Sequence, residues 1–295
     1  MRASLLLAVL APVLLAQQGE VPPFSLPDGV EVKSALVYAK YGPREMHLDL
    51  YLPAKGDGPF PAVVYVHGGG WRNGNRNAFR RQAAHMATQG FVGACIEYRL
   101  SGEEKWPAAI YDAKAAVRWM RANARTYRID PERIGAAGGS AGGHLVALLG
   151  TTAGQPDLEG GGGNSGVSSA VRAVAAFNPA VDLVMFGKRV PDNASNAVAL
   201  FLGALYTEKP ALWDKASPTL HVTPKSAAFL FLHGDADKTV PYQQSVEMRD
   251  KLKAAGVRAE LFTAEGAGHG FFNRSPWFEP TLQRMEQFFR ETLGQ

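Results

Sequence analysis

The 295-residue sequence has almost no cysteine, because Cys95 in the apolar run FVGACIEY is its only one. One cysteine cannot close an internal disulfide, so the hydrophobic core must hold the fold. No basic neighbour would lower the pKa of this thiol. We therefore expect Cys95 to be a small buried strand residue and not a nucleophile.

The sequence also lacks runs of lysine or arginine, internal repeats and nucleic-acid-binding motifs. Its net charge of +4 is spread along the chain, which predicts a mildly cationic surface and no nucleic-acid partner. The fractions of hydrophobic residues, 46%, and charged residues, 20%, are ordinary for one soluble globular domain. No pattern in the chain predicts an oligomeric state.

Long apolar runs are missing except at the N-terminus, MRASLLLAVLAPVLLAQQ. Arg2, the apolar residues 5–15 and the small residue Ala16 predict a signal peptide over residues 1–16, followed by a leader over 17–29. The apolar stretch is too short for a comfortable membrane span. We expect a secreted or periplasmic protein with no stable membrane span after cleavage, and a retained N-terminal anchor is the alternative.

Short apolar runs then alternate with longer amphipathic segments. Strands are predicted over residues 46–52, 62–66, 91–98, 133–138, 173–177, 227–234 and 258–264, and helices over 77–90, 107–124, 144–150 and 246–256. Most of these strands are apolar throughout, as in a parallel sheet covered on both faces. The pattern predicts one α/β domain over residues 30–295, with a mostly parallel twisted sheet of about eight strands, helices on both faces and an antiparallel edge.

Two stretches interrupt this alternation. Residues 155–166 are rich in glycine and predict a flexible surface connection. Residues 182–226 contain prolines and two aromatic–apolar patches, which predict an inserted cap of short helices over a pocket. The aromatic residues that we expect to line such a pocket are Trp71, Tyr98, Phe186, Phe201, Tyr206 and Trp213.

Residues 138–142 read GGSAG, a G-x-S-x-G pattern that arises by chance in a glycine-rich chain. Its context is more informative, because a predicted strand precedes it and a helical run follows it. A strand–turn–helix of this kind holds a nucleophilic serine at a turn so sharp that only small neighbours fit. We predict Ser140 to be the nucleophile, and a plain loop is the alternative.

The segment YVHGGGW, residues 65–71, follows another predicted strand. Backbone N–H groups that point at a developing negative oxygen lower the barrier to acyl transfer, and glycines let the backbone approach that oxygen. We predict an oxyanion hole formed by the N–H groups of Gly69, Gly70 and Ala141. His67 is assigned a structural role in orienting the glycine loop, because a better candidate base lies downstream.

That base is His269, in the glycine-flanked segment GAGHGFF. The segment LFLHGDADKTVPYQQ places Asp235 and Asp237 after a predicted strand, so the order along the chain is Ser, Asp, His. An acid at this place fixes the histidine tautomer and stabilises the imidazolium ion. We assign it to Asp237, because the chain after it turns into the next helix, and we assign Asp235 to capping the loop. The reverse assignment stays open.

Three further polar residues receive structural assignments. His144 follows the serine on a helix and is predicted to pack beneath the turn; no suitably spaced ligands accompany it, so no metal site is predicted. Asp112 and Arg118, on the predicted helix 107–124, are expected to form pairs on the surface or behind the site.

The motifs HGGGW, GGSAGG, HGDADKTVP and GHGF together resemble those of α/β-hydrolase esterases of the HGGG type, which are related to feruloyl-esterase-like and hormone-sensitive-lipase-like enzymes. The resemblance covers residues 30–293 and implies that fold, a triad of Ser140, Asp237 and His269, and no metal or organic cofactor. The short N-terminal cap favours the feruloyl- and acetyl-ester branch. The motifs do not select the acyl group, since similar sequences include dipeptidyl-peptidase-like enzymes, acetylxylan esterases and kynurenine formamidases.

We therefore expect a secreted serine carboxylic-ester hydrolase that acts on small acyl or aryl esters, including feruloyl or acetyl esters of plant cell-wall polysaccharide. One alternative is a prolyl-oligopeptidase-like peptidase or another amide hydrolase, although 295 residues leave no room for the propeller domain that such peptidases usually carry. The other is a non-catalytic binding protein on a hydrolase fold. Such a protein would typically lack a member of the triad, and all three candidates are present.

Overall fold

The computed structural model describes residue 21 and residues 23–189 and 193–294. The predicted signal peptide over residues 1–16 lies outside these ranges. Among the described residues, no helix has the length and apolar character needed to cross a membrane.

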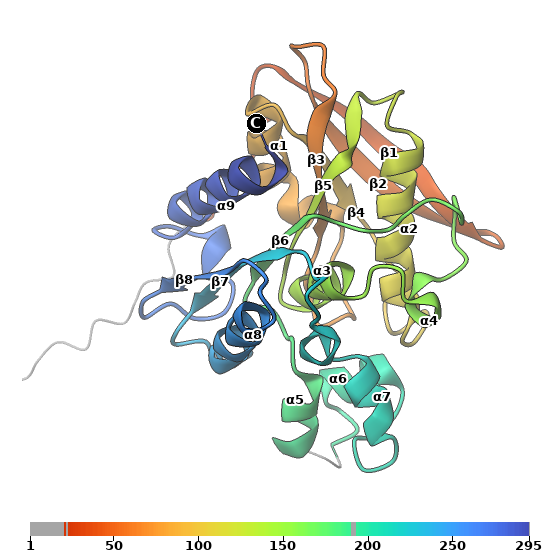
Figure 1. Ribbon diagram of the computed structural model, residues 1–295, viewed down its shortest axis with the longest axis vertical. Helices are drawn as coiled ribbons and strands as arrows, with labels where there is room; N and C mark the ends of the chain where they lie inside the picture. The colour runs from red at the N-terminus through yellow and green to blue at the C-terminus, as the bar shows by residue number, and fades with distance from the viewer. Residues whose placement is uncertain (1–20, 22, 190–192, 295) are drawn as a thin grey trace, which may run out of the picture.

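One eight-stranded sheet forms the centre of the molecule, with the strand order β1-β2-β4-β3-β5-β6-β7-β8 (Figure 1). Strands β1 and β2 pair in antiparallel fashion, as do β2 and β4, and every other neighbouring pair is parallel. The predicted mixed sheet with an antiparallel edge is thus confirmed. The strands are β1 (Val30–Tyr41), β2 (Arg44–Pro53), β3 (Phe60–Val66), β4 (Val92–Ile96), β5 (Ile129–Gly139), β6 (Ala173–Phe177), β7 (Ala228–Gly234) and β8 (Ala259–Ala264).

Helices cover both faces of the sheet, as predicted. The helices are η1 (Arg76–Phe79), α1 (Arg80–Thr88), α2 (Ala108–Ala122), α3 (Ala141–Thr151), α4 (Pro156–Glu159), α5 (Leu183–Arg189), α6 (Ala197–Leu202), α7 (Pro210–Lys215), η2 (Pro218–His221), α8 (Gln243–Ala254), η3 (Phe271–Asn273) and α9 (Phe278–Leu293). The short helices α5, α6 and α7, all within the predicted insertion 182–226, lie together at one end of the molecule (Figure 1).

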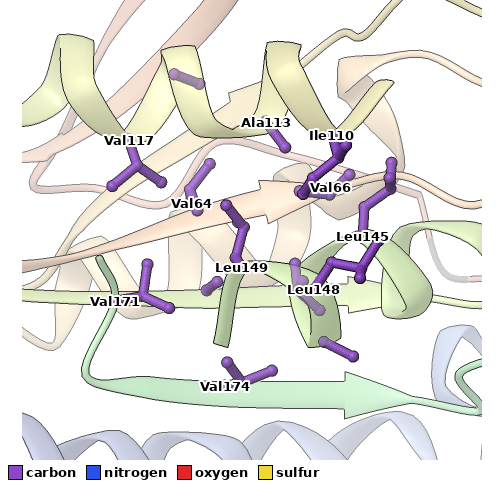
Figure 2. Close-up of a cluster of buried hydrophobic side chains, with 14 of the residues drawn as sticks. Val64, Val66, Ile110, Ala113, Val117, Leu145, Leu148, Leu149, Val171 and Val174 are labelled. Carbon is purple, nitrogen blue, oxygen red and sulfur yellow. The ribbon is translucent and has the colours of Figure 1, made fainter. Parts of the chain in front are cut away.

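The two faces of each central strand enter separate core layers, because successive strand side chains point to opposite sides. On β3, Val64 and Val66 face the layer under α2 and α3, where they join Ile110, Leu145 and other apolar side chains (Figure 2). Val63 and Tyr65 enter the opposite layer, which contains residues of α1 and α9. Covering both faces explains why these strands are apolar throughout.

Strand β1 and the long helix α9 were not predicted. Strand β1 pairs with β2 through two register shifts and carries Ala35 at a φ of 54°, so its exposed and buried positions do not alternate cleanly. Helix α9 buries one stripe of apolar side chains against the sheet, and its 3.6-residue periodicity was present in the sequence.

The glycine-rich segment 155–166 lies partly at the surface, as expected, and its predicted flexibility stays a prediction. Arg118, 2% exposed, donates hydrogen bonds to the backbone oxygens of Glu159, Gly162 and Gly163, so this loop is tied to α2. Asp112 is fully buried and pairs with Arg99. The side chains of Asp112 and Arg118 are therefore not on the surface, and each of them binds a neighbouring loop.

Candidate active site

Ser140 stands at the turn between β5 and α3, with a φ of 55° and a ψ of −118°. Its N–H donates to the carbonyl of Phe177 at the end of β6, 2.9 Å away, and its carbonyl accepts from His144 N–H, also at 2.9 Å. These bonds fix a backbone conformation that is strained for any residue except glycine. The serine side chain is thereby held at the carboxyl edge of the parallel strands.

The glycines two residues before and after Ser140 have no room for a side chain. A Cβ on Gly142 would lie 2.1 Å from the carbonyl oxygen of Val66, and one on Gly138 would lie 2.6 Å from the carbonyl oxygen of Gly142. Both distances are far shorter than any normal contact. The G-x-S-x-G spacing therefore follows from the close approach of the turn to the end of β3.

His269 and Asp237 reach Ser140 from two loops at the same edge of the sheet. His269 Nε2 lies 3.0 Å from Ser140 Oγ, and His269 Nδ1 lies 2.7 Å from Asp237 Oδ2. With Nδ1 protonated, the ring donates to the carboxylate and leaves Nε2 free to accept the serine proton. The three predicted residues form one continuous hydrogen-bonded line.

The side chain of Asp237 is fully buried and accepts hydrogen bonds on both oxygens. Oδ1 accepts from Thr239 N–H at 2.8 Å and from Val240 N–H at 3.0 Å, while Oδ2 faces His269. Burial alone would raise the pKa of Asp237, but hydrogen bonds from His233, His269 and the backbone outweigh it and hold the pKa well below its usual range. In the folded protein at neutral pH, the Asp237 carboxylate is therefore charged.

Asp235, the alternative acid, lies on the other side of this turn. Its Oδ1 accepts a hydrogen bond from Gly266 N–H at 2.6 Å and thus ties the β7 loop to the loop that carries His269. It is exposed, whereas Asp237 is not. The structure places Asp237, and not Asp235, against His269.

His233 is a member of this site that sequence reasoning missed. It is fully buried at the end of β7, with Nδ1 2.7 Å from Ser245 Oγ and Nε2 3.1 Å from the carbonyl of Val240 and 3.3 Å from Asp237 Oδ2. Since a carbonyl cannot donate, Nε2 carries the proton and Nδ1 accepts from the serine hydroxyl. The signal was available, because His233 directly precedes the glycine and the aspartate pair within HGDAD.

The glycine loop 67–70 packs directly on the serine turn. A Cβ on Gly68 would lie 2.7 Å from the carbonyl oxygen of Gly139 and 3.4 Å from the Cβ of Ser140. Gly69 and Gly70 have φ values of 111° and 60°, and their N–H groups donate to no other group in the part of the chain that the structure describes. Ala141 contributes an N–H of the first turn of α3, which has no partner within the helix. The predicted amides are thus available beside Ser140.

His67 and Tyr98 support this loop from inside the protein. His67 Nδ1 donates to the carbonyl of Gly68 at 2.8 Å, and its ring stacks on that of Tyr98 at a centroid distance of 4.3 Å. Burial lowers the pKa of His67, against a smaller opposing effect of its bond to Gly68. Tyr98 is 1% exposed, so its ring belongs to the layer beneath the loop, and its contact with substrate stays a prediction.

Trp71 and His144 join the glycine loop to the segment 182–226. Trp71 Nε1–H donates to His144 Nδ1 at 3.2 Å, and His144 Nε2–H donates to the carbonyl of Ala216, just after α7, at 2.8 Å. The Trp71 ring also stacks on Phe201 of α6, with centroids 4.6 Å apart. Trp71 is 4% exposed, so its predicted contact with substrate likewise stays a prediction.

The remaining aromatics proposed for a pocket divide between core and partly exposed positions. Phe201 and Trp213 are each 1% exposed, whereas Phe186 and Tyr206 are half-buried and pack at the margin of the core. Phe201 and Trp213 therefore hold the segment 182–226 together and do not face an open pocket.

The buried His144 predicts a pH-dependent loss of stability. Burial lowers its pKa to about 4, from 6.5 in the unfolded chain, so below about pH 6.5 the unfolded state binds a proton that the folded state does not. We expect the free energy of unfolding to fall by about 3 kcal/mol more between about pH 7 and pH 4 than in the variant His144→Gln. Urea unfolding at several pH values measures this, with His221→Gln as the control. Equal slopes in wild type and His144→Gln would refute the assignment.

Asn178, the residue after β6, is the second member of the site that the sequence analysis missed. Its side chain is fully buried, and its amide nitrogen lies 3.2 Å from both ring nitrogens of His269. A polar residue directly after the apolar strand AVAAF was its sequence signal.

Within the described residues, no three histidine, cysteine, aspartate or glutamate side chains gather as metal ligands would.

Several solved structures that are similar to this one are esterases. A truncated carbohydrate esterase from gut microbiota is 32% identical, with a TM-score of 0.82 over 91% of this chain and 98% of that one. The propionate-bound esterase Est2 of Thermogutta terrifontis is 33% identical, with a TM-score of 0.76 over 90% of this chain and 94% of that one.

Among curated sequences, Esterase LipC of Mycobacterium tuberculosis is 34% identical over 222 residues, which are 72% of this chain and 53% of LipC. The chain spans about half the length of the curated relatives that it matches. The BD-FAE family model matches residues 48–252, most of the described sheet and the whole glycine loop and serine turn. With this match and the eight-stranded sheet, the chain belongs to the BD-FAE family of α/β-hydrolase esterases.

Proposed function

We propose that this protein is an exported serine carboxylic-ester hydrolase that removes short acyl groups, acetyl groups foremost, from esterified carbohydrate. The observation that carries the proposal is the hydrogen-bonded line from Ser140 Oγ through His269 to Asp237. Two similar proteins support the class of substrate: one is a carbohydrate esterase, and the Thermogutta esterase binds propionate in one structure and butyrate in another.

In this mechanism Ser140 Oγ attacks the ester carbonyl while His269 Nε2 takes the serine proton. The N–H groups of Gly69, Gly70 and Ala141 bind the oxyanion of the tetrahedral intermediate. The imidazolium, stabilised by Asp237, then protonates the leaving alcohol, and an acyl-serine remains. Water activated by His269 hydrolyses the acyl-serine and releases the carboxylic acid. The chain's own groups supply every step.

Export and the cap belong to this proposal. A signal peptide over residues 1–16, cleaved after Ala16, would deliver the enzyme to polymeric carbohydrate outside the cytoplasm. Residues 182–226 act as a small cap: a Cβ on Gly70 would lie 3.8 Å from the Cβ of Ala197, so α6 borders the glycine loop directly. Feruloyl esters of the same polysaccharides are the second candidate, on the family resemblance.

A substrate panel tests the proposed function. We expect p-nitrophenyl esters of two- to four-carbon acids to be hydrolysed at least about tenfold faster, by kcat/KM, than the eight-carbon ester, since one methylene that a pocket cannot accept costs about 1–3 kcal/mol. We also expect acetate release from acetylated xylan. Methyl ferulate serves as the aryl comparison, and a proline-containing peptide p-nitroanilide tests amide hydrolysis. Cleavage of the anilide in preference to all esters would refute the proposal.

A further inference from the structure

Asn178 has a backbone conformation that asparagine adopts at a cost. Its φ is 36°, in the left-handed region that non-glycine residues rarely occupy, and its N–H donates to the carbonyl of Leu232 on β7 at 2.8 Å. The side chain is 0% exposed. Strain of this kind persists where the surrounding structure fixes it, and it clusters at functional sites.

The amide of Asn178 lies over the face of the His269 ring. Its nitrogen is 3.2 Å from both Nδ1 and Nε2, and these nitrogens flank one ring carbon. An atom in the ring plane at equal distance from both would overlap that carbon at this separation, so the amide must lie above the ring. The in-plane directions are already taken by Asp237 Oδ2 at 2.7 Å and Ser140 Oγ at 3.0 Å. Asn178 therefore covers one face of the ring.

The other end of the amide has no partner. Asn178 Oδ1 is buried and accepts no hydrogen bond within the described part of the chain. A buried amide oxygen without a donor costs about 1–3 kcal/mol, more than a weak N–H···π contact returns. Packing alone would therefore favour an apolar residue at this position, and glycine would also remove the backbone strain.

We propose that Asn178 is a positioning residue that holds the His269 ring in line with Asp237 and Ser140. The amide nitrogen lies against the face of the ring, and this contact restrains the ring from rotating out of line. Its effect on turnover rests on the proposed function, whereas its effect on the ring does not.

Few other charges act on this ring. In the described part of the chain, the loop after β7 contributes Asp237, with His233 behind it. The serine turn contributes the Ser140 hydroxyl, and the end of β6 contributes Asn178. The ring's own loop carries Glu265, which is exposed. A charge placed at residue 178 would thus act on the imidazole at short range, as Asp237 does from the other loop.

Two variants of Asn178 test the inference. In Asn178→Asp, a carboxylate over the ring favours the imidazolium ion, so we expect the acid limb of kcat/KM to move up by about one pH unit or more. The NMR titration of His269 in histidine-labelled protein should move by the same amount. In Asn178→Gly, which accepts the same φ, we expect kcat to fall about tenfold with KM within about twofold, because the ring loses its support.

Asn164 provides the matched control. It also has a left-handed φ, 51°, but it is exposed on the glycine-rich loop, so Asn164→Gly and Asn164→Asp repeat the backbone change away from His269. These variants should retain wild-type kcat and the wild-type His269 titration. The inference is overturned if Asn178→Asp leaves that titration in place, or if Asn178→Gly retains wild-type kcat. Wild-type protein that hydrolyses no ester would overturn the proposed function instead, and the NMR titration would still decide the role of Asn178.

Discussion

Ser140→Ala is expected to lower kcat on p-nitrophenyl acetate by at least about 10⁴-fold, because the variant has no group that can form the acyl-enzyme. The oxyanion N–H groups and the His269–Asp237 pair are unaffected, so any residual rate reflects binding and electrostatic stabilisation alone. Steady-state kinetics over a range of enzyme concentrations measure the loss.

The fold of this variant should be intact, since alanine fits wherever serine does and Ser140 is tied to its neighbours by its backbone. Far-ultraviolet circular dichroism and the melting temperature check this. A fluorophosphonate probe should label the wild type and Ser195→Ala, whose serine is exposed on the segment 182–226, but not Ser140→Ala. Labelling of Ser140→Ala, or its full activity, would remove Ser140 from the mechanism.

Asp237→Asn is expected to lower kcat by about 10³- to 10⁴-fold, although the asparagine side chain has nearly the same size and shape as the aspartate side chain. The N–H groups of Thr239 and Val240 require an acceptor on one side of residue 237, so the new amide oxygen must face them. The amide NH₂ then faces His269 Nδ1 and forces that nitrogen to accept. The proton moves to Nε2, and the histidine can no longer take the proton of Ser140.

Asp235→Asn is the matched control for this variant. Asp235 lies two residues away, and its side chain accepts a hydrogen bond from Gly266 N–H, which an amide oxygen would also accept. We expect its kcat to stay within about threefold of the wild type, since it touches none of the reacting groups. If Asp235→Asn were the inactive variant and Asp237→Asn the active one, the acid would have to be reassigned to Asp235.

The central strands of the fold were predictable because their burial is extreme. Strands such as β6, AVAAF, are covered on both faces, and such strands leave an uninterrupted apolar run between helical segments. Strand β1 lies at the open edge with bulges and exposed positions, so no periodic pattern marks it. Prediction thus succeeded where two helix layers cover a strand, and it failed at β1, where register shifts interrupt the alternation of side chains.

The site was predictable to the extent that its chemistry is local in sequence. Ser140 and the glycine loop could be identified from the sequence, because a sharp turn and a close backbone approach each need glycines at fixed spacing. Asn178 and His233 have much weaker sequence signals. Each is one polar residue at the end of an apolar strand, and its partner lies on another loop. Their roles depend on which strand ends are neighbours in the sheet, which only the β5-β6-β7 order reveals.

The bridge from Trp71 through His144 to Ala216 limits how this scaffold can be redesigned. Its last link is the hydrogen bond that His144 Nε2–H donates to a main-chain oxygen of the segment 182–226, so the bridge depends on where the carbonyl of residue 216 lies. A chimaera that exchanges this segment for one from another esterase must bring a carbonyl to the same place. Without a carbonyl at that place, His144 and Trp71 would lose their support and the loop that binds the oxyanion would loosen. A graft intended to change the substrate range would then lower the rate of hydrolysis of every substrate.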